Sequence, residues 1–156
     1  MAYQKLQAGR AWQVNKSDNT DIPNIGIAGP TGATTTGSAT QLIDSSATFL
    51  TSGVKLNMIV VNTTDNTQAV VIGIEDDNTL TVSANIFAVS GKNYAIYGGN
   101  QEGAVLYIGT AGNLKVTTVA GDDVTFQGVN TGTFFPVNVV KVFATGTSAD
   151  NIIALW

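Results

Sequence analysis

The residues best suited to chemistry are carboxylates, and they are densest at positions 75–78, which read Glu-Asp-Asp-Asn. Oxygen ligands at this density are typical of calcium sites, but the run lacks the alternating spacing and the distal glutamate of a calcium loop. Between two apolar segments the same residues form a hairpin turn, which is the interpretation that we favour. Asp122 and Asp123, which follow Gly121, receive the same interpretation.

Three acidic residues offer carboxylate pairs of the kind used in glycoside hydrolysis, namely Glu75, Glu102 and Asp123. The sequence alone does not fix the distance between these groups, so the hypothesis of a hydrolase rests on composition only. The chain contains no cysteine and no histidine, which excludes disulfides, thiolate or imidazole metal sites and Ser-His-Asp triads. We therefore expect no enzyme activity and no cofactor.

The glycine-rich residues 109–113 are a second motif with a chemical interpretation, because glycine-rich loops can cradle phosphates. A phosphate cradle opens a helix, whereas this segment lies between two apolar runs of strand length. We predict a hairpin here.

The charge content indicates which partners the chain can have. Charged residues make up 12% of the sequence, against roughly a quarter in typical soluble domains. The net charge is −4, and the seven basic residues are scattered from Lys5 to Lys141. No basic patch can form, so we expect no nucleic-acid partner. The sequence shows no apolar signal region and no run of roughly 18 apolar residues, so we expect a soluble protein with no membrane partner.

Short apolar segments separated by turn residues predict an all-β protein without sustained helices. One closely spaced set predicts a small antiparallel β-barrel, with strands at residues 41–43, 58–62, 69–74, 79–82 and 94–97. A second set predicts a small antiparallel β-sandwich or barrel, with strands at residues 104–108, 114–119 and 124–127 and two more within residues 132–156.

The connecting and terminal segments carry further signals. Residues 3–14 could form a strand or an extended arm, and we prefer an extended N-terminal arm over residues 3–24 that packs on a neighbouring subunit or a partner. Residues 26–32 carry glycine at every third position, and we expect a flexible linker and not a collagen-like stalk, which needs many repeats. The apolar residues 152–156 must be covered either by the chain's own core or by a neighbouring subunit.

Five aromatic residues could form a carbohydrate platform: Trp12, Tyr107, Phe134, Phe135 and Trp156. In a chain with so few charges, aromatic side chains are more often anchors of a core or of a subunit interface. The candidate interface residues are therefore Leu6, Trp12, Ile22, Phe134, Phe135 and Trp156.

Several motifs follow one another in a recognisable order. They read YQKLQ and GRA within residues 3–11, SD and DIPN within residues 17–24, GAVLYIGTAGNLKVT at 103–117, GTFFPV at 132–137 and GTSADNIIALW at 146–156. In this order they resemble small head-associated virion proteins of tailed bacteriophages. Residues 33–99 interrupt the pattern, and their segments 44–49, 61–65 and 80–87 resemble a separate β-module that also occurs in phage structural proteins.

The resemblance implies a host β-domain formed by residues 1–32 and 99–156, with a small β-barrel inserted at residues 33–98. It implies a virion structural protein, first of all a decoration (cement) protein that is made in the host cytoplasm and binds the major capsid protein on the outer capsid surface. We expect a homo-oligomer and take a trimer as its expected oligomeric state. The N-terminal arm is then expected to pack on a neighbouring subunit or on the capsid. The alternatives are a tail, baseplate or fibre component, or a module that binds a host-surface glycan.

Overall fold

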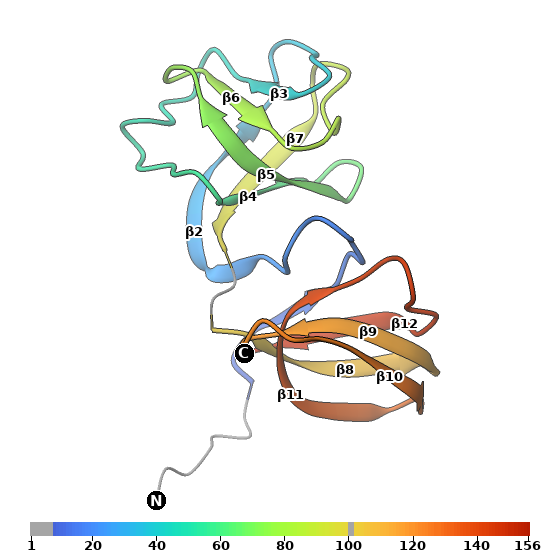
Figure 1. The fold of residues 1–156 in the computed structure, drawn as a ribbon. Coiled ribbons are helices and arrows are strands. Elements are labelled where there is room, and N and C mark those ends of the chain that lie inside the picture. The colour runs from blue at the N-terminus through green and yellow to red at the C-terminus, as the bar shows by residue number, and fades with distance from the viewer. Residues whose placement is uncertain (1–7, 100–101) are drawn as a thin grey trace, which may run out of the picture. The chain divides into compact units, whose positions relative to one another are not determined.

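The computed structural model describes residues 8–99 and 102–156 and confirms the predicted all-β class (Figure 1). Twelve strands form two antiparallel sheets of six strands each. In the part of the chain that the structure describes, no helix has the length and hydrophobicity of a membrane span.

The chain divides into two compact units, each with one sheet and one hydrophobic core. The first unit consists of Met1–Ile22 and Asn100–Trp156, and the second unit is Pro23–Gly99. The sequence placed the first boundary between residues 32 and 33. The observed boundary lies earlier because residues 24–33 form a strand of the second sheet.

The sheet of the first unit has the strand order β1-β12-β8-β11-β9-β10. Its strands are β1 (Ala11–Gln13), β8 (Ala104–Thr110), β9 (Gly112–Thr118), β10 (Asp123–Val129), β11 (Thr133–Val142) and β12 (Asp150–Leu155). The core side of the sheet carries Leu106, Ile108, Leu114, Val116 and Ile152, all buried.

Strand β11 changes neighbours along its length, because it pairs with β8 from Thr133 and with β9 towards Val142. Register shifts accompany the change, and Val139 faces both Ala104 and Thr118. Since β11 lies between β8 and β9, these two consecutive strands do not pair with each other. The hairpin predicted at residues 109–113 was wrong, and the segment is a connection between strands that share a neighbour.

The predicted N-terminal arm was also wrong for the residues that the structure describes. β1 pairs with β12, and the backbone N–H groups of Val14 and Ile22 donate to the carbonyl oxygens of Ile152 and Val140 at 2.9 and 2.7 Å. Val14 and Ile22 are buried in the first core. Their apolar side chains complete this core, so residues 11–22 are part of the first unit.

The sheet of the second unit has the order β2-β7-β4-β5-β6-β3. Its strands are β2 (Asn24–Ala33), β3 (Gln41–Ile43), β4 (Ile59–Asn62), β5 (Thr67–Ile74), β6 (Thr79–Val82) and β7 (Asn93–Gly98). The residues that follow β2 return to the opposite edge, because Thr36 bridges Ile43 of β3. The core inside this sheet includes Leu42, Val60, Val71, Leu80 and Ile96, all buried.

The glycines of residues 26–32 serve close packing and not the flexible linker that the sequence predicted. Gly29 and Gly32 lie in β2, which pairs with β7. A Cβ atom at position 29 would lie 3.3–3.5 Å from atoms of Ile96. At position 32 a Cβ atom would lie only 2.6 Å from Asp44 Oδ2. At position 32 the strand therefore approaches Asp44 at a distance that a side chain would prevent, whereas the contact at position 29 is merely tight.

The carboxylates at 75–78 form the turn between the paired strands β5 and β6, as the hairpin interpretation predicted. Each acidic side chain there accepts a hydrogen bond from the protein itself. Asp77 Oδ1 accepts from the backbone N–H groups of Leu50 and Thr51 at 2.9 and 3.2 Å, and Glu75 Oε1 accepts from Thr81 Oγ1 at 2.8 Å. The cluster thus holds the turn and the neighbouring loop in place.

Candidate interface and polar pocket

The structure uses most of the six candidate interface residues within the first unit. Leu6 lies outside the described residues. Ile22 is only 2% exposed and Phe135 only 7%, and both belong to the first core. Trp12 and Trp156 are partly buried and pack against the same core. Ile22 and Phe135 were therefore wrong as interface residues, because both side chains are buried in the core of their own unit.

Phe134 is the exception, with 66% of its surface exposed. It lies on the face of the sheet opposite the core, where cross-strand pairing places Ile153, Tyr107 and Phe134 in one row over β12, β8 and β11. The rings of Tyr107 and Phe134 contact each other with their centroids 5.3 Å apart at an interplanar angle of 60°. Such a tilted contact is a favourable aromatic geometry.

A second apolar pair lies on the same face, because Val105 and Leu155 are paired two residues further along β8 and β12. Side chains two residues apart in a strand project from the same face. We call Val105, Tyr107, Phe134, Ile153 and Leu155 the apolar face. None of its five residues is charged, whereas the solvent face of an antiparallel sheet is usually polar. The arrangement suits contact with another macromolecule.

The second unit contains a pocket of about 480 Å³ beside the end of β2. Its walls come from β2, from the loop that follows β3 and from Tyr94 of β7. The residues that line it are Pro30, Thr31, Gly32, Ala33, Thr35, Asp44, Ser46, Ala47, Thr48 and Tyr94. Hydroxyl groups are thus the commonest polar groups at the wall.

Asp44 and Tyr94 form the polar base of this pocket, and they are only 5% and 2% exposed. The Tyr94 hydroxyl donates to Asp44 Oδ2 at 2.8 Å, and the backbone N–H of Ser46 donates to Asp44 Oδ1 at 2.9 Å. Burial of the phenol, together with the hydrogen bond to Asp44, raises the pKa of Tyr94. The tyrosine is therefore a fixed hydrogen-bond donor to the carboxylate over the physiological pH range.

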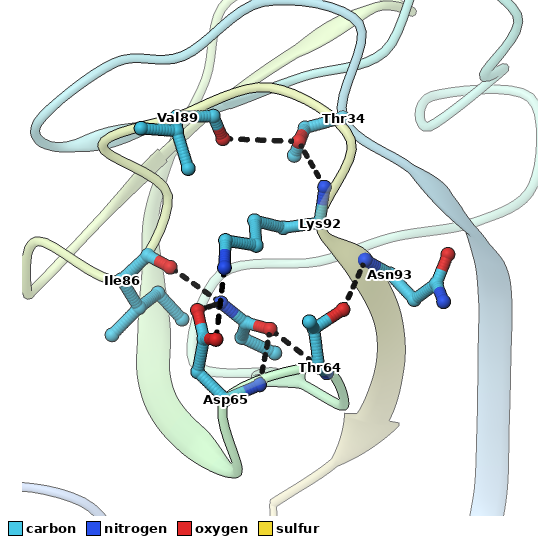
Figure 2. Close-up of polar contacts among 8 residues, drawn as sticks. Thr34, Thr64, Asp65, Ile86, Val89, Lys92 and Asn93 are labelled. Atoms are coloured by element: carbon cyan, nitrogen blue, oxygen red, sulfur yellow. Dashed lines mark hydrogen bonds and ion pairs between the residues drawn. The ribbon is translucent and has the colours of Figure 1, made fainter.

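A network of polar side chains fixes the two strands that carry the pocket walls (Figure 2). Thr34, directly after β2, accepts a hydrogen bond at its Oγ1 from the backbone N–H of Lys92 at 3.0 Å. The backbone N–H of Asn93, the first residue of β7, donates to Thr64 Oγ1 at 2.9 Å. The end of β2 and the start of β7 are thereby held next to the pocket.

Asn62 is the centre of this network and is completely buried. Its Oδ1 accepts from the backbone N–H groups of Thr64 and Asp65, and its Nδ2 donates to Asp65 Oδ2 and to the carbonyl oxygen of Ile86. Lys92 Nζ binds Asp65 Oδ1 at 2.9 Å (Figure 2). This hydrogen bond from Lys92 is the main cause that lowers the pKa of Asp65.

Sequence reasoning missed the pocket, although both of its central residues carried a signal. Asp44 follows a predicted strand directly, and Tyr94 lies within another. Their positions are 50 residues apart, and pairing between distant strands is not visible in one sequence. The three residues considered for glycoside hydrolysis are divided between the units, with Glu75 in the second and Glu102 and Asp123 in the first.

Comparisons of the chain with models of protein families, with curated proteins and with solved structures found no match. The apolar face of the first unit and the polar pocket of the second unit are therefore the features from which function has to be inferred.

Proposed function

We propose that the chain is a structural protein of a tailed-bacteriophage virion, namely a decoration protein that binds the major capsid protein on the outer capsid surface. It acts there as a homo-oligomer and not as an enzyme. A tail, baseplate or fibre component is the alternative within the same class.

The sequence resemblance supports this proposal, and the fold brings the resembling segments next to one another. The segments 103–117, 132–137 and 146–156 resemble phage head-associated proteins, and they contain β8, the start of β11 and β12. These three strands are neighbours in the first sheet. The resembling segments therefore form one continuous surface although they are far apart in the sequence.

The observation that carries the proposal is the exposure of Phe134 beside Tyr107 on the apolar face. An uncharged apolar surface with exposed aromatic rings is costly in water and is typical of the centre of stable interfaces. Permanent packing against a capsid lattice is the kind of contact that covers such a surface.

Binding to particles tests the proposal. The gene is deleted from the phage genome that carries it, and purified protein is added to the resulting particles. We expect the wild-type protein to bind the heads, and Phe134→Ser to lower occupancy about tenfold, as expected for a hot-spot residue. Ile72→Ser is the matched control, because Ile72 is 56% exposed but lies in the second unit.

Two outcomes would contradict the proposal. One is that mass spectrometry of gradient-purified wild-type virions does not detect the chain. The other is that the chain separates with tails when heads and tails are purified apart, which would favour the alternative.

A further inference from the structure

We propose that the pocket around Asp44 binds a carbohydrate, with the carboxylate accepting hydrogen bonds from the hydroxyl groups of one sugar residue. The site lies entirely in the second unit. It does not depend on where the protein is located, so its test and that of the virion proposal can fail separately.

The Asp44 carboxylate has acceptor positions that the protein does not use. A carboxylate has about four acceptor positions, and the hydrogen bonds from Tyr94 and Ser46 occupy two of them. Among the described residues that line the pocket, none is Lys or Arg. A buried carboxylate is costly unless it is hydrogen-bonded or paired. Donors from a ligand would complete its hydrogen bonding, and sugar hydroxyls are such donors.

The pocket wall offers groups that match those of a sugar. Thr31 and Ser46 contribute hydroxyl groups, each of which can donate and accept. The lining hydroxyls of Thr35 and Thr48 already form hydrogen bonds within the protein. The ring of Pro30 offers an apolar surface for the C–H groups of a sugar ring. The volume of about 480 Å³ falls within the roughly 300–1,000 Å³ of small-molecule sites.

Gly32 lets strand β2 pass close to the Asp44–Tyr94 pair at the base of the pocket. A Cβ atom there would lie 2.6 Å from Asp44 Oδ2 and 2.6 Å from the Tyr94 hydroxyl oxygen. A calcium ion fits less well, because it takes about six to eight oxygen ligands and Asp44 is the one carboxylate among the described lining residues.

The geometry also indicates weak binding. The Tyr94 ring is buried and does not offer a stacking platform. The ligand is therefore held mainly by hydrogen bonds, and we expect a Kd on the order of 1 mM for a single sugar residue. Linking several copies of the chain would raise the effective affinity for a surface that carries many such sugars.

The experiment uses the full ¹⁵N-labelled chain and follows backbone amide shifts by NMR. The probes are the methyl glycosides of glucose, galactose and mannose, then N-acetylglucosamine and N-acetylgalactosamine, and separately n-butylammonium chloride and calcium chloride. We expect at least one sugar to shift the amides of Asp44, Ser46 and Tyr94 in a saturable way. Neither of the two salts should do so.

Three variants link the shifts to the pocket. Asp44→Asn keeps the size of the side chain but removes its charge and one acceptor oxygen, and should weaken sugar binding about tenfold. Thr31→Val removes one hydroxyl of the wall from an exposed position and should weaken it about threefold. Thr67→Val is the matched control at an exposed position outside the pocket, and should bind like the wild type.

The proposal is overturned if none of the sugars causes saturable shifts at the pocket, or if only the ammonium or calcium salt does. It is also overturned if Thr31→Val and Thr67→Val bind the sugar equally well. Should Asp44→Asn lose the dispersed spectrum of the folded protein, the comparison of the two threonine variants still decides the outcome.

Discussion

The two units are built from different parts of the chain. The first unit joins both ends of the sequence, since β1 pairs with β12 and the Gln13 side chain donates to the Ile152 carbonyl 139 residues away. The second unit is one continuous segment, Pro23–Gly99. All of its strands are available once that segment has been synthesised, whereas the first unit is complete only with β12. The second unit can therefore fold before the first is finished.

The units also differ in what they bury. Buried polar residues of the second unit are Asn24, Thr34, Asp44 and Asn62, while those of the first unit are Thr20 and Thr147. Conversely, the apolar face with Phe134 belongs to the first unit. The first unit exposes an aromatic contact, and the second unit buries more polar side chains beside its hydrophobic core, of which Asp44 lines the pocket.

The largest effect is expected from deletion of residues 150–156. The deletion removes β12 from between β1 and β8 and takes Ile152 and Ala154 out of the first core. We expect the first unit to lose its cooperative unfolding transition in calorimetry while the second unit keeps its own. Simultaneous loss of both transitions would show that the units are not independent.

A smaller and sharper contrast comes from two neighbouring phenylalanines. Phe135 is buried against Phe126, with ring centroids 4.6 Å apart, whereas Phe134 is exposed. We expect Phe135→Ala to lower the free energy of unfolding by about 3–5 kcal/mol. Phe134→Ala should change it by less than about 0.5 kcal/mol. Urea denaturation of the first unit measures both, and equal losses would contradict the assignment of the two faces.

Asn62→Ala tests the hydrogen-bond network around the buried Asn62 of the second unit. The change leaves the backbone N–H groups of Thr64 and Asp65 and the Ile86 carbonyl without their partner. These hydrogen bonds are partly buried and the Asn62 side chain is fully buried, so we expect the free energy of unfolding of the second unit to fall by about 1–3 kcal/mol. Asn85→Ala, at an exposed position of the same unit, is the control and should have little effect.

The strands of the second unit were largely predictable. The predicted segments 41–43 and 79–82 have the same bounds as β3 and β6. Each is a short run of apolar and β-branched residues, and turn-forming residues such as Asp44 and Asn78 flank the two runs. Local patterns of this kind depend on residues close in the sequence, which is why they can be read from it.

Pairing between distant segments was not predictable. β1 is three residues long and has no pattern of its own, so its membership of the first sheet depends on a partner at the other end of the chain. The glycines of β2 suggested flexibility, because their close neighbours Ile96 and Asp44 are known only from the fold. For the same reason the Asp44–Tyr94 pair and its pocket could not be inferred.

The smallest expected effect is a dependence of the second unit on alkaline pH. The pKa of Tyr94 is raised above its ordinary value of 10.0 by burial and by the hydrogen bond to Asp44, so the folded state favours the neutral phenol. This contribution to stability is complete below about pH 10 and declines as the pH rises towards the pKa of the folded state. Urea denaturation at increasing pH should show the decline, and Tyr94→Phe should flatten it. An unchanged slope in that variant would assign the dependence to other groups.

The first unit is closed by its own N-terminal residues, and amide hydrogen exchange of the dilute monomer tests this closure directly. The N–H groups of Val14, Ser17 and Ile22 donate to the carbonyl oxygens of Ile152, Val142 and Val140 at 2.7–2.9 Å. We predict that these three amides are protected as strongly as those of β8, because local opening would break the core. If the three amides exchange at the rate of an unstructured peptide while β8 stays protected, the N-terminal residues do not close the first unit and form a free arm.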